Sequence, residues 1–333
     1  MKPWLAVPPS LAHALTPYGL PIFSRLYSPF CSRDLPSYKP FDWKGLHFEN
    51  RFGIAGGVDK NAENVLDWQR LGAGFLEVGT ITPREQGPNS GRIIDRKNSH
   101  EALWNKMGFP NQGSHRILNR IQKQKNRIKV PLFINAGKNR NTPQENAAQD
   151  YAQVIQNFKS YADAFVVNIS SPNTQGLRNL QTGPSLHTFL ESLRNELARG
   201  DASPPQQPLL LKLSPDMEID DFQNSVRIAS QFVDGYICTN TTASREGAPF
   251  FPPEGGMSGK PLAARSELLL EKCQEALGPS RSNYLIVSCG GVVHPLDALR
   301  RLEKGADLVQ TYSGLIFYGP WFFQDCCKLL KVV

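Results

Sequence analysis

The segment Ala164-Phe165-Val166-Val167-Asn168-Ile169-Ser170, with the residues Ser171-Pro172-Asn173-Thr174 that follow it, is the most informative part of this 333-residue chain. It begins as an apolar, β-branched run typical of a buried strand, and two asparagines and two serines stand where that strand ends. Packing alone does not require such a cluster. An asparagine amide carries both a donor and an acceptor, so a pair of asparagines suits a planar ligand with alternating carbonyl and N–H groups.

Eight short apolar runs recur from residue 50 onward, and most are continuous, as in parallel strands buried on both faces. The expected strands are residues 52–58, 75–82, 131–137, 164–170, 209–214, 235–241, 285–290 and 308–313. The expected helices are residues 61–71, 113–127, 143–161, 184–199, 219–232, 264–277, 295–303 and 320–330. Eight βα units in order predict an α/β fold, a (β/α)8 TIM barrel. The alternative is a doubly wound sheet, which would more often carry G-x-G-x-x-G after its first strand, and Ala55-Gly56-Gly57-Val58-Asp59-Lys60 does not match that pattern.

Composition and charge narrow the classes of function. Lys and Arg number 37 against 30 Asp and Glu, a formal net charge of +7, without a run of five basic residues. Nucleic-acid binding is therefore not expected, whereas this excess can attract anionic ligands or an anionic membrane surface. The six cysteines form no C-x-x-C pair and no histidine lies at zinc spacing, so we expect no metal site and a reducing compartment. No apolar run reaches the ~18 residues that a membrane-spanning helix needs.

The first forty residues carry an amphipathic pattern of their own. Two short helices, separated by Pro17-Tyr18-Gly19, are expected before the barrel. The apolar positions of the first are Leu11, Ala14, Leu15 and Tyr18, and those of the second, opened by Pro21, are Ile22, Phe23, Leu26, Tyr27 and Phe30. On pattern alone these helices either cap the bottom of the barrel or form a hairpin on a membrane surface, because both roles leave the same stripe.

Polar side chains stand at the carboxyl ends of the expected strands except the seventh, which ends in Gly290-Gly291, and barrels of this kind build their active sites at that end. In chain order they are Asp59, Lys60, Thr80, Asn135, Asn168, Ser171, Asn173, Lys212, Thr239, Asn240, Thr241, Tyr312 and Ser313. Because a buried lysine needs an anionic or strongly accepting partner, Lys60 and Lys212 predict a ligand with carboxylate, phosphate or ring-oxygen groups. Gly290-Gly291 and Ser313-Gly314 follow the seventh and eighth strands, where barrels often bind phosphate through backbone N–H groups.

Taken in order, these motifs resemble those of the class 2, quinone-dependent dihydroorotate dehydrogenases, over nearly the whole chain. The segments that carry the resemblance are Ala55-Gly56-Gly57-Val58-Asp59-Lys60, Gly79-Thr80-Ile81-Thr82-Pro83-Arg84, Asn105-Lys106-Met107-Gly108-Phe109, Asn135-Ala136-Gly137-Lys138-Asn139, Asn168-Ile169-Ser170-Ser171-Pro172-Asn173-Thr174, Thr239-Asn240-Thr241-Thr242, Gly255-Gly256-Met257-Ser258-Gly259 and Gln310-Thr311-Tyr312-Ser313-Gly314. The resemblance implies a helical extension over residues 1–40 that contacts membrane and quinone, and an FMN-binding (β/α)8 barrel over residues 41–333.

The cofactor that the resemblance implies is FMN, at the mouth of the barrel. The residues that would surround it are Gly56, Gly57, Thr80, Asn135, Asn168, Lys212, Thr239, Gly259, Gly291, Tyr312 and Ser313. Lys212 would lie near the pyrimidine edge of the flavin, where a positive charge stabilises the reduced anion. The family usually has alanine where Gly56 stands, arginine where Lys106 stands and isoleucine where Ala136 stands.

The substrate that the resemblance implies is dihydroorotate, oxidised to orotate in the synthesis of UMP. The residues that would hold it are Lys60, Asn105, Lys106, Met107, Gly108, Phe109, Asn168, Asn173, Asn240 and Thr241, with the loop 105–109 closing over it. Ser171 would be the catalytic base, which takes a proton from C5 while C6 delivers hydride to flavin N5. A serine hydroxyl is a weak base. The resemblance suggests Thr174 and Phe109, acting through an ordered water, as its activators.

In the second half-reaction, the resemblance implies, electrons pass to a membrane quinone. His13 and Arg96 match positions that the family places near its quinone tunnel, although a surface histidine and a surface arginine are the alternatives. The implied location is peripheral, on the cytoplasmic side of the cell inner membrane. Two other functions stay open at this point: a class 1-like enzyme that uses fumarate or NAD, and a flavin- or pyrimidine-binding barrel without activity.

Overall fold

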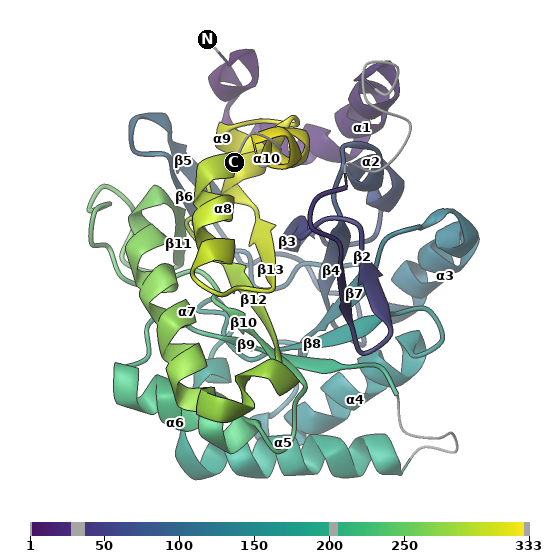
Figure 1. The fold of residues 1–333 in the computed structure, drawn as a ribbon, viewed down its shortest axis with the longest axis vertical. Coiled ribbons are helices and arrows are strands. Elements are labelled where there is room, and N and C mark those ends of the chain that lie inside the picture. The colour runs from purple at the N-terminus through teal and green to yellow at the C-terminus, as the bar shows by residue number, and fades with distance from the viewer. Residues whose placement is uncertain (1, 28–36, 200–205, 330–333) are drawn as a thin grey trace.

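Eight parallel strands close into a barrel in the computed structural model, which describes residues 2–27, 37–199 and 206–329 (Figure 1). In order around the barrel they are β3 (Phe52–Asp59), β4 (Phe75–Ile81), β7 (Leu132–Ala136), β8 (Ala164–Asn168), β9 (Leu209–Leu213), β10 (Gly235–Cys238), β12 (Leu285–Cys289) and β13 (Leu308–Thr311). β13 pairs with β3 and closes the ring, with Val309 opposite Phe52. The predicted fold is therefore confirmed.

Helices surround the barrel and cover the outer faces of its strands (Figure 1). They are α2 (Val65–Arg70), α3 (Ser114–Gln124), α4 (Ala147–Phe158), α5 (Gly183–Ala198), α6 (Ile219–Ala229), α7 (Ala263–Leu277) and α8 (Pro295–Glu303), with α9 (Ser313–Phe317) and α10 (Phe322–Leu329) after the last strand. The predicted first helix, residues 61–71, begins too early. The carboxylate of Asp59 accepts the backbone N–H groups of Glu63 and Asn64 at 2.9 and 2.8 Å, which holds a turn ahead of α2. The last predicted helix, residues 320–330, corresponds to α10, whereas α9 lies ahead of it and was not predicted. The final predicted residue, Leu330, lies outside the described residues.

The amino end of the barrel is closed by a hairpin of two short strands, β1 (Phe41–Trp43) and β2 (Leu46–Phe48). Phe48 packs edge-on against Phe75 and Phe133 inside the barrel, with ring centroids 5.9 and 6.3 Å apart. Aromatic rings in such edge-to-face pairs fill the interior densely. The hairpin thus fills this end of the barrel, and the cavities described below lie at the opposite end, where the strands finish.

A three-stranded antiparallel sheet adds structure that the sequence did not predict. Its strands are β5 (Ile94–Lys97), β6 (Ala102–Asn105) and β11 (Gly256–Gly259), with Met257 opposite Trp104. Each strand has only four residues, and β11 comes from a different barrel connection from the other two. Local periodicity does not reveal a pairing between strands so short and so far apart in the chain.

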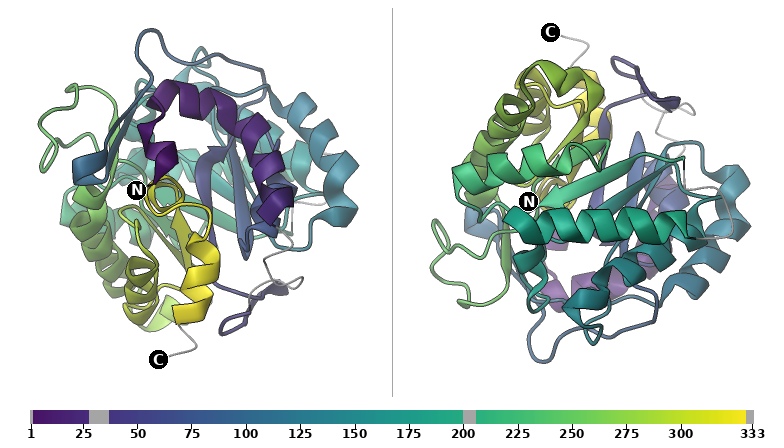
Figure 2. Two further views of the ribbon diagram at one scale, coloured as in Figure 1. Left: turned by 90° about the horizontal axis from the view of Figure 1, so that it is seen from above. Right: turned by 90° about the horizontal axis from the view of Figure 1, so that it is seen from below.

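In the described part of the N-terminal segment, a short 3-10 helix, η1 (Pro3–Ala6), precedes a continuous α-helix, α1 (Pro9–Tyr27), so the predicted break at Pro17-Tyr18-Gly19 is wrong. Pro17 and Pro21 both lie inside α1, which curves across one end of the barrel (Figure 2, left). A proline in a helix leaves the carbonyl four residues earlier without its usual donor. The carbonyl freed by Pro21 is that of Pro17, and it accepts a hydrogen bond from the Asn64 side chain at 3.3 Å. Tertiary contact thus substitutes for the missing helical bond. Phe30, assigned to the second helix, lies outside the described residues.

α1 lies over the carboxyl ends of the strands, so the alternative that it caps the bottom of the barrel is wrong. The hydroxyl of Ser24 donates to the Asp67 carboxylate of α2 at 2.6 Å, and Leu20, Phe23 and Tyr27 pack on the core. On the opposite side a continuous stripe of apolar side chains is 49–75% exposed: Leu11, Leu15, Tyr18, Ile22 and Leu26. The structure contains a helix with one apolar face on the barrel and a second apolar face in solvent.

Candidate active site

Two cavities lie at the carboxyl end of the barrel and share part of their lining. The first cavity is lined by most of the predicted site residues: Gly56, Gly57, Lys60, Thr80, Asn105, Met107, Gly108, Phe109, Asn168, Ser171, Asn173, Lys212, Thr239, Asn240, Thr241, Gly291, Tyr312 and Ser313. The second cavity, of about 750 Å³, lies under α1 and includes His13 and Arg96. The lining that belongs to both consists of Lys60, Ile94, Leu103, Pro110 and Tyr312.

Three predicted site residues lie outside the lining of both cavities. Asn135 is fully buried beneath the first cavity and accepts a hydrogen bond from Asn168 at 3.3 Å. Gly259 lies where β11 approaches Glu101, too close for any side chain. Lys106 turns outward and pairs with the Glu254 carboxylate at 3.1 Å, because neighbouring side chains in extended backbone point to opposite sides and Asn105 takes the inner one.

Ser171 lies just after β8 and is 5% exposed. Within the described part of the chain, its oxygen takes part in a single hydrogen bond, accepted from the backbone N–H of Asn173 at 3.2 Å. No imidazole or carboxylate adjoins the hydroxyl there, so the structure does not provide a conventional base to activate it. The Oγ1 atom of Thr174 is buried without a partner among the described residues.

Amide side chains beside Ser171 are held in fixed orientations. Asn168 donates to the Thr80 hydroxyl at 3.0 Å and accepts from the Ser170 hydroxyl at 2.9 Å. Asn240 also donates to the Ser170 hydroxyl, at 2.9 Å, and Asn173 donates to the Asn105 side chain at 3.0 Å. The Oδ1 atom of Asn173 remains buried and without a partner among the described residues. Such orphaned acceptors are rare in folded proteins, so this one is available to a ligand donor.

Glu77, which the sequence analysis missed, is the centre of a buried polar cluster beneath the first cavity. Its carboxylate accepts hydrogen bonds from Lys212 at 3.0 Å, from Gln310 at 2.6 Å and from Asn135. Burial alone would lower the pKa of Lys212, but the adjacent Glu77 carboxylate raises it above the usual value. A charged ammonium therefore lies at the floor of the cavity. The sequence does contain a sign of this cluster, because a glutamate inside the apolar run Phe75-Leu76-Glu77-Val78 needs a buried partner.

Gly56 makes room for this cluster. A Cβ at that position would lie 2.3 Å from the Glu77 Oε1 atom and 2.8 Å from the Asn135 Nδ2 atom. Real Cβ atoms do not approach polar atoms so closely, so an alanine would have to displace the carboxylate. The glycine, where the resemblance leads one to expect alanine, thus has a local reason in this chain.

Lys60 connects the two cavities and contacts α1. Its ammonium lies 3.5 Å from the Nε2 atom of His13. Burial lowers the pKa of Lys60 to about 8 against the raising effects of Asp59 and Glu63. Burial and the Lys60 charge together lower the pKa of His13 to about 4. His13 is thus a neutral imidazole at the cavity wall at neutral pH, with Lys60 as its donor.

This arrangement makes the docking of α1 sensitive to acid. The pKa of His13 is about 4 in the folded protein against 6.5 for a free histidine, so the unfolded chain binds more protons between these values. Stability should therefore fall as pH drops from about 6.5 toward 4, by about 3 kcal/mol at most. Unfolding free energies of the wild type and of His13→Gln, measured across this range, test the effect. If the unfolding free energy of the wild type changes with pH in the same way as that of the variant, the prediction is contradicted.

Arg96 anchors the start of the chain beside the second cavity. Its guanidinium donates to the carbonyls of Leu5 and Val7 at 2.9 and 2.8 Å. These bonds hold the segment that precedes α1 against β5. Arg96 is therefore not simply a charge on the surface, because its guanidinium binds two backbone carbonyls.

Comparisons with known proteins agree on one family. A family model described as "Dihydroorotate dehydrogenase" matches residues 41–333. A Dichelobacter nodosus protein named "Dihydroorotate dehydrogenase (quinone)" is 39% identical over 326 residues, covering 96% of this chain and 94% of the relative. A Marinomonas protein of the same name is 40% identical over 322 residues, covering 95% and 92%.

Solved structures agree with these sequence matches. The crystal structure of the DHODH of Eimeria tenella in complex with ferulenol superposes with a TM-score of 0.85 and 29% identity. The superposition covers 97% of this chain and 92% of that one. The similarity therefore includes the N-terminal part as well as the barrel.

Proposed function

The chain belongs to the dihydroorotate dehydrogenase family, and from that premise we propose that it oxidises dihydroorotate to orotate, with FMN taking up the hydride and a membrane quinone accepting the electrons. The reaction would supply orotate for the synthesis of UMP. In this proposal residues 41–333 bind substrate and flavin, and residues 1–40 contact quinone and membrane.

The observation that carries the proposal is the pair of cavities with a common wall. The first is lined by Ser171 and a set of fixed amides, which suits a small planar anion. The second is larger, mostly apolar in its lining and covered by α1, which suits a lipid-like ring with a long tail. A redox group that lies along the shared wall would reach both, as two half-reactions at one cofactor require.

The residues of the first cavity fit FMN in two respects. Lys212 is a buried cation, and the Oε1 atom of Gln310 beside it is a buried acceptor without a partner among the described residues, so together they complement a ring that offers both an oxygen and an N–H group. At Gly290 and Gly291, φ angles of +107° and +72° keep the backbone free of side chains where a phosphate would bind. When bound, FMN would accept hydride from the substrate and pass two electrons to the quinone.

The protein groups would orient the substrate and remove one proton. Asn105, Asn173 and Asn240 would hold the carbonyl and N–H groups of dihydroorotate, and Lys60 would pair with its negative charge. Ser171 Oγ would accept the C5 proton while its own hydroxyl proton passes to the ordered water that the resemblance suggests beside Thr174. The loop 105–109, whose carbonyls at Gly108 and Phe109 accept from Gln86 at 2.9 and 3.1 Å, would exclude water.

Anaerobic titration with dihydroorotate tests the proposal. A yellow protein should bleach as substrate is added and regain its colour with a soluble quinone. Fumarate or NAD as the effective acceptor would select the class 1-like alternative. Orotate binding without bleaching would select the barrel without activity, and a protein that binds no flavin would contradict the proposal altogether.

We also propose that α1 rests on the cytoplasmic face of the cell inner membrane. Among the described residues, no helix is both long and apolar enough to cross a bilayer. The exposed stripe on α1 is instead suited to insertion into the interface, and no acidic residue interrupts the helix. Quinone dissolved in the bilayer would then enter the second cavity beneath α1.

Charged substitutions on this stripe should abolish membrane binding while leaving the barrel intact. For Ile22→Glu combined with Leu26→Glu, we expect at least about tenfold weaker binding to phospholipid vesicles, because two anchors no longer enter the apolar layer. Reduction of the flavin by dihydroorotate should be unchanged. Leu296→Glu is the matched control, since Leu296 is equally exposed but lies on α8. Full vesicle binding by the double variant would exclude this face as the contact.

A further inference from the structure

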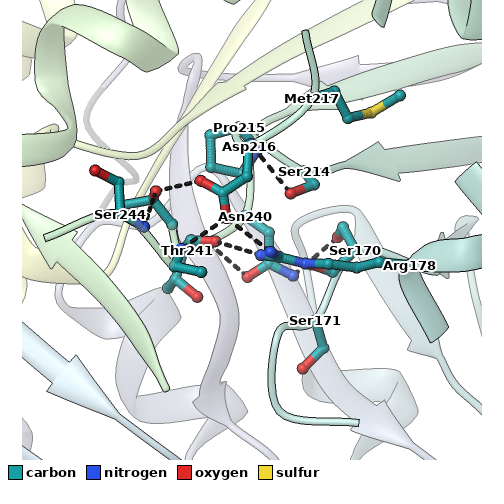
Figure 3. A network of polar contacts seen from close by, with 12 residues as sticks. Ser170, Ser171, Arg178, Ser214, Pro215, Asp216, Met217, Asn240, Thr241 and Ser244 are labelled. Carbon is teal, nitrogen blue, oxygen red and sulfur yellow. Dashed lines mark hydrogen bonds and ion pairs between the residues drawn. The ribbon is translucent and has the colours of Figure 1, made fainter. Parts of the chain in front are cut away.

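An arginine outside both cavities joins the three loops that follow β8, β9 and β10. Arg178 lies in the 3-10 turn η6 (Leu177–Gln181). Its Nε atom donates to the Ser170 carbonyl at 3.1 Å and its Nη2 atom to the Thr241 carbonyl at 3.2 Å. Its Nη1 atom pairs with the Asp216 carboxylate at 2.7 Å. Figure 3 shows the guanidinium between the segment of Ser170 and Ser171 and the segment of Asn240 and Thr241.

Asp216 continues the connection from the other side. Its carboxylate accepts the backbone N–H of Ala243 at 2.6 Å and the hydroxyl of Thr242. Its own N–H donates to the Ser214 hydroxyl at 3.2 Å, which fixes the turn after β9. Besides their ion pair, the two side chains make four hydrogen bonds, to the Ser170 and Thr241 carbonyls, the Ala243 N–H and the Thr242 hydroxyl. These bonds tie the loop after β10 to the loops after β8 and β9.

The groups held in this way are next to those proposed to act on the substrate. Ser170, whose carbonyl Arg178 binds, directly precedes Ser171, and Thr241 lies on the wall of the first cavity. The Ser171 side chain points away from Arg178 (Figure 3), and neither Arg178 nor Asp216 lines the first cavity. The pair thus acts on the backbone that carries the active groups and cannot itself touch substrate.

Stability alone does not account well for this arrangement. The side chains of Arg178 and Asp216 are 24% and 23% exposed, so solvent screens part of their attraction and reduces what the pair adds to stability. A shift of about 1 Å in a reacting group, by contrast, can cost about a hundredfold in rate. The planar fork of a guanidinium bonds three acceptors at fixed angles, which a lysine cannot reproduce.

We propose that Arg178 and Asp216 are positioning residues for proton abstraction, which set the distance between the loop of Ser171 and the loop of Asn240 and Thr241. This inference rests on the proposed function. The side chains of Asn240 and Thr241 on one loop would locate the substrate, and the Ser171 hydroxyl on the other would receive the substrate's proton. The distance between the two loops must therefore stay constant.

Arg178→Lys tests the inference because it keeps the charge and removes the fork. We expect the rate of flavin reduction at saturating dihydroorotate to fall about 10–100-fold, with a larger kinetic isotope effect for substrate deuterated at C5. Flavin content, melting temperature and reoxidation by quinone should stay near wild-type values. Arg199→Gln, which removes an exposed arginine paired with Glu196 at 2.8 Å, is the matched control.

A second variant, Asp216→Asn, and a second measurement, hydrogen exchange, distinguish failure of this inference from failure of the proposed function. Asp216→Asn should reproduce the slowed reduction if Arg178→Lys does not fold. Hydrogen exchange should rise at residues 170–176 and 240–243 in both variants and not in the control. If the wild-type flavin is not reduced by dihydroorotate, the proposed function fails, and the exchange data still decide whether the pair holds the loops. A wild-type reduction rate with an unchanged isotope effect, or a parallel loss of flavin and melting temperature, would overturn the inference.

Discussion

Ser171→Ala is expected to keep its flavin and to reduce it roughly 10²–10⁴ times more slowly than the wild type with dihydroorotate. The hydroxyl is the proposed proton acceptor, and its removal leaves the hydride step without a partner for the C5 proton. The structural change is small, since the oxygen is buried and accepts only the Asn173 N–H among the described residues. Stopped-flow absorbance under anaerobic conditions measures the rate.

The control for this variant is Ser230→Ala, which removes a hydroxyl that donates to the Arg227 carbonyl at the end of α6. Its reduction rate should equal that of the wild type. An unchanged rate of flavin reduction in Ser171→Ala would show that Ser171 is not the proton acceptor. Loss of flavin from that variant would mean instead that the hydroxyl supports the structure of the cavity.

Glu77→Leu should lower the free energy of unfolding by about 3–5 kcal/mol. The substitution leaves the Lys212 ammonium at the barrel interior without its counter-charge, and Gln310 and Asn135 lose their acceptor. Because domains are stable by only about 5–15 kcal/mol, such a loss is a large part of the total. Urea unfolding of the flavin-free protein measures it without interference from cofactor binding.

A double-mutant cycle separates the ion pair from packing. Glu77→Leu combined with Lys212→Met replaces two buried charges by apolar side chains, and should recover much of the stability lost in the single variant. The double variant should still bind FMN poorly, since the cation at the cavity floor is gone. If the double variant loses the sum of the two single effects, the charges are not coupled and the interpretation of this cluster is wrong.

The barrel could be predicted because its signal is local. Most strands contain a nearly continuous apolar run, such as residues 164–167 of β8, which are all buried. Eight such runs alternating with helical segments permit few other arrangements. The position of the active groups followed from the same signal, since parallel strands bring their carboxyl ends together. Ser171, Asn173 and Asn240 could be assigned to one cavity in this way before any contact was known.

The unpredicted features depend on contacts between distant parts of the chain. Pro17 and Pro21 predict a break in the first helix, but Asn64 binds the freed carbonyl and the helix continues. Lys106 stands between residues of the first cavity and yet turns away from it to Glu254. Which side of this extended segment faces the cavity depends on the pairing of β6 with β5 and β11, and local sequence does not encode that pairing.

The sequence by itself determined that this chain forms a closed parallel barrel and which of its residues gather at the open end, because both depend on the periodicity of apolar side chains. Only the tertiary structure decided the pairs: Glu77 with Lys212, Arg178 with Asp216, and His13 with Lys60. Each pair joins elements that become neighbours when the ring closes or when α1 docks across it. Charge pairing acts over a few ångströms, so it is set by the folded geometry and leaves no periodic pattern along the chain.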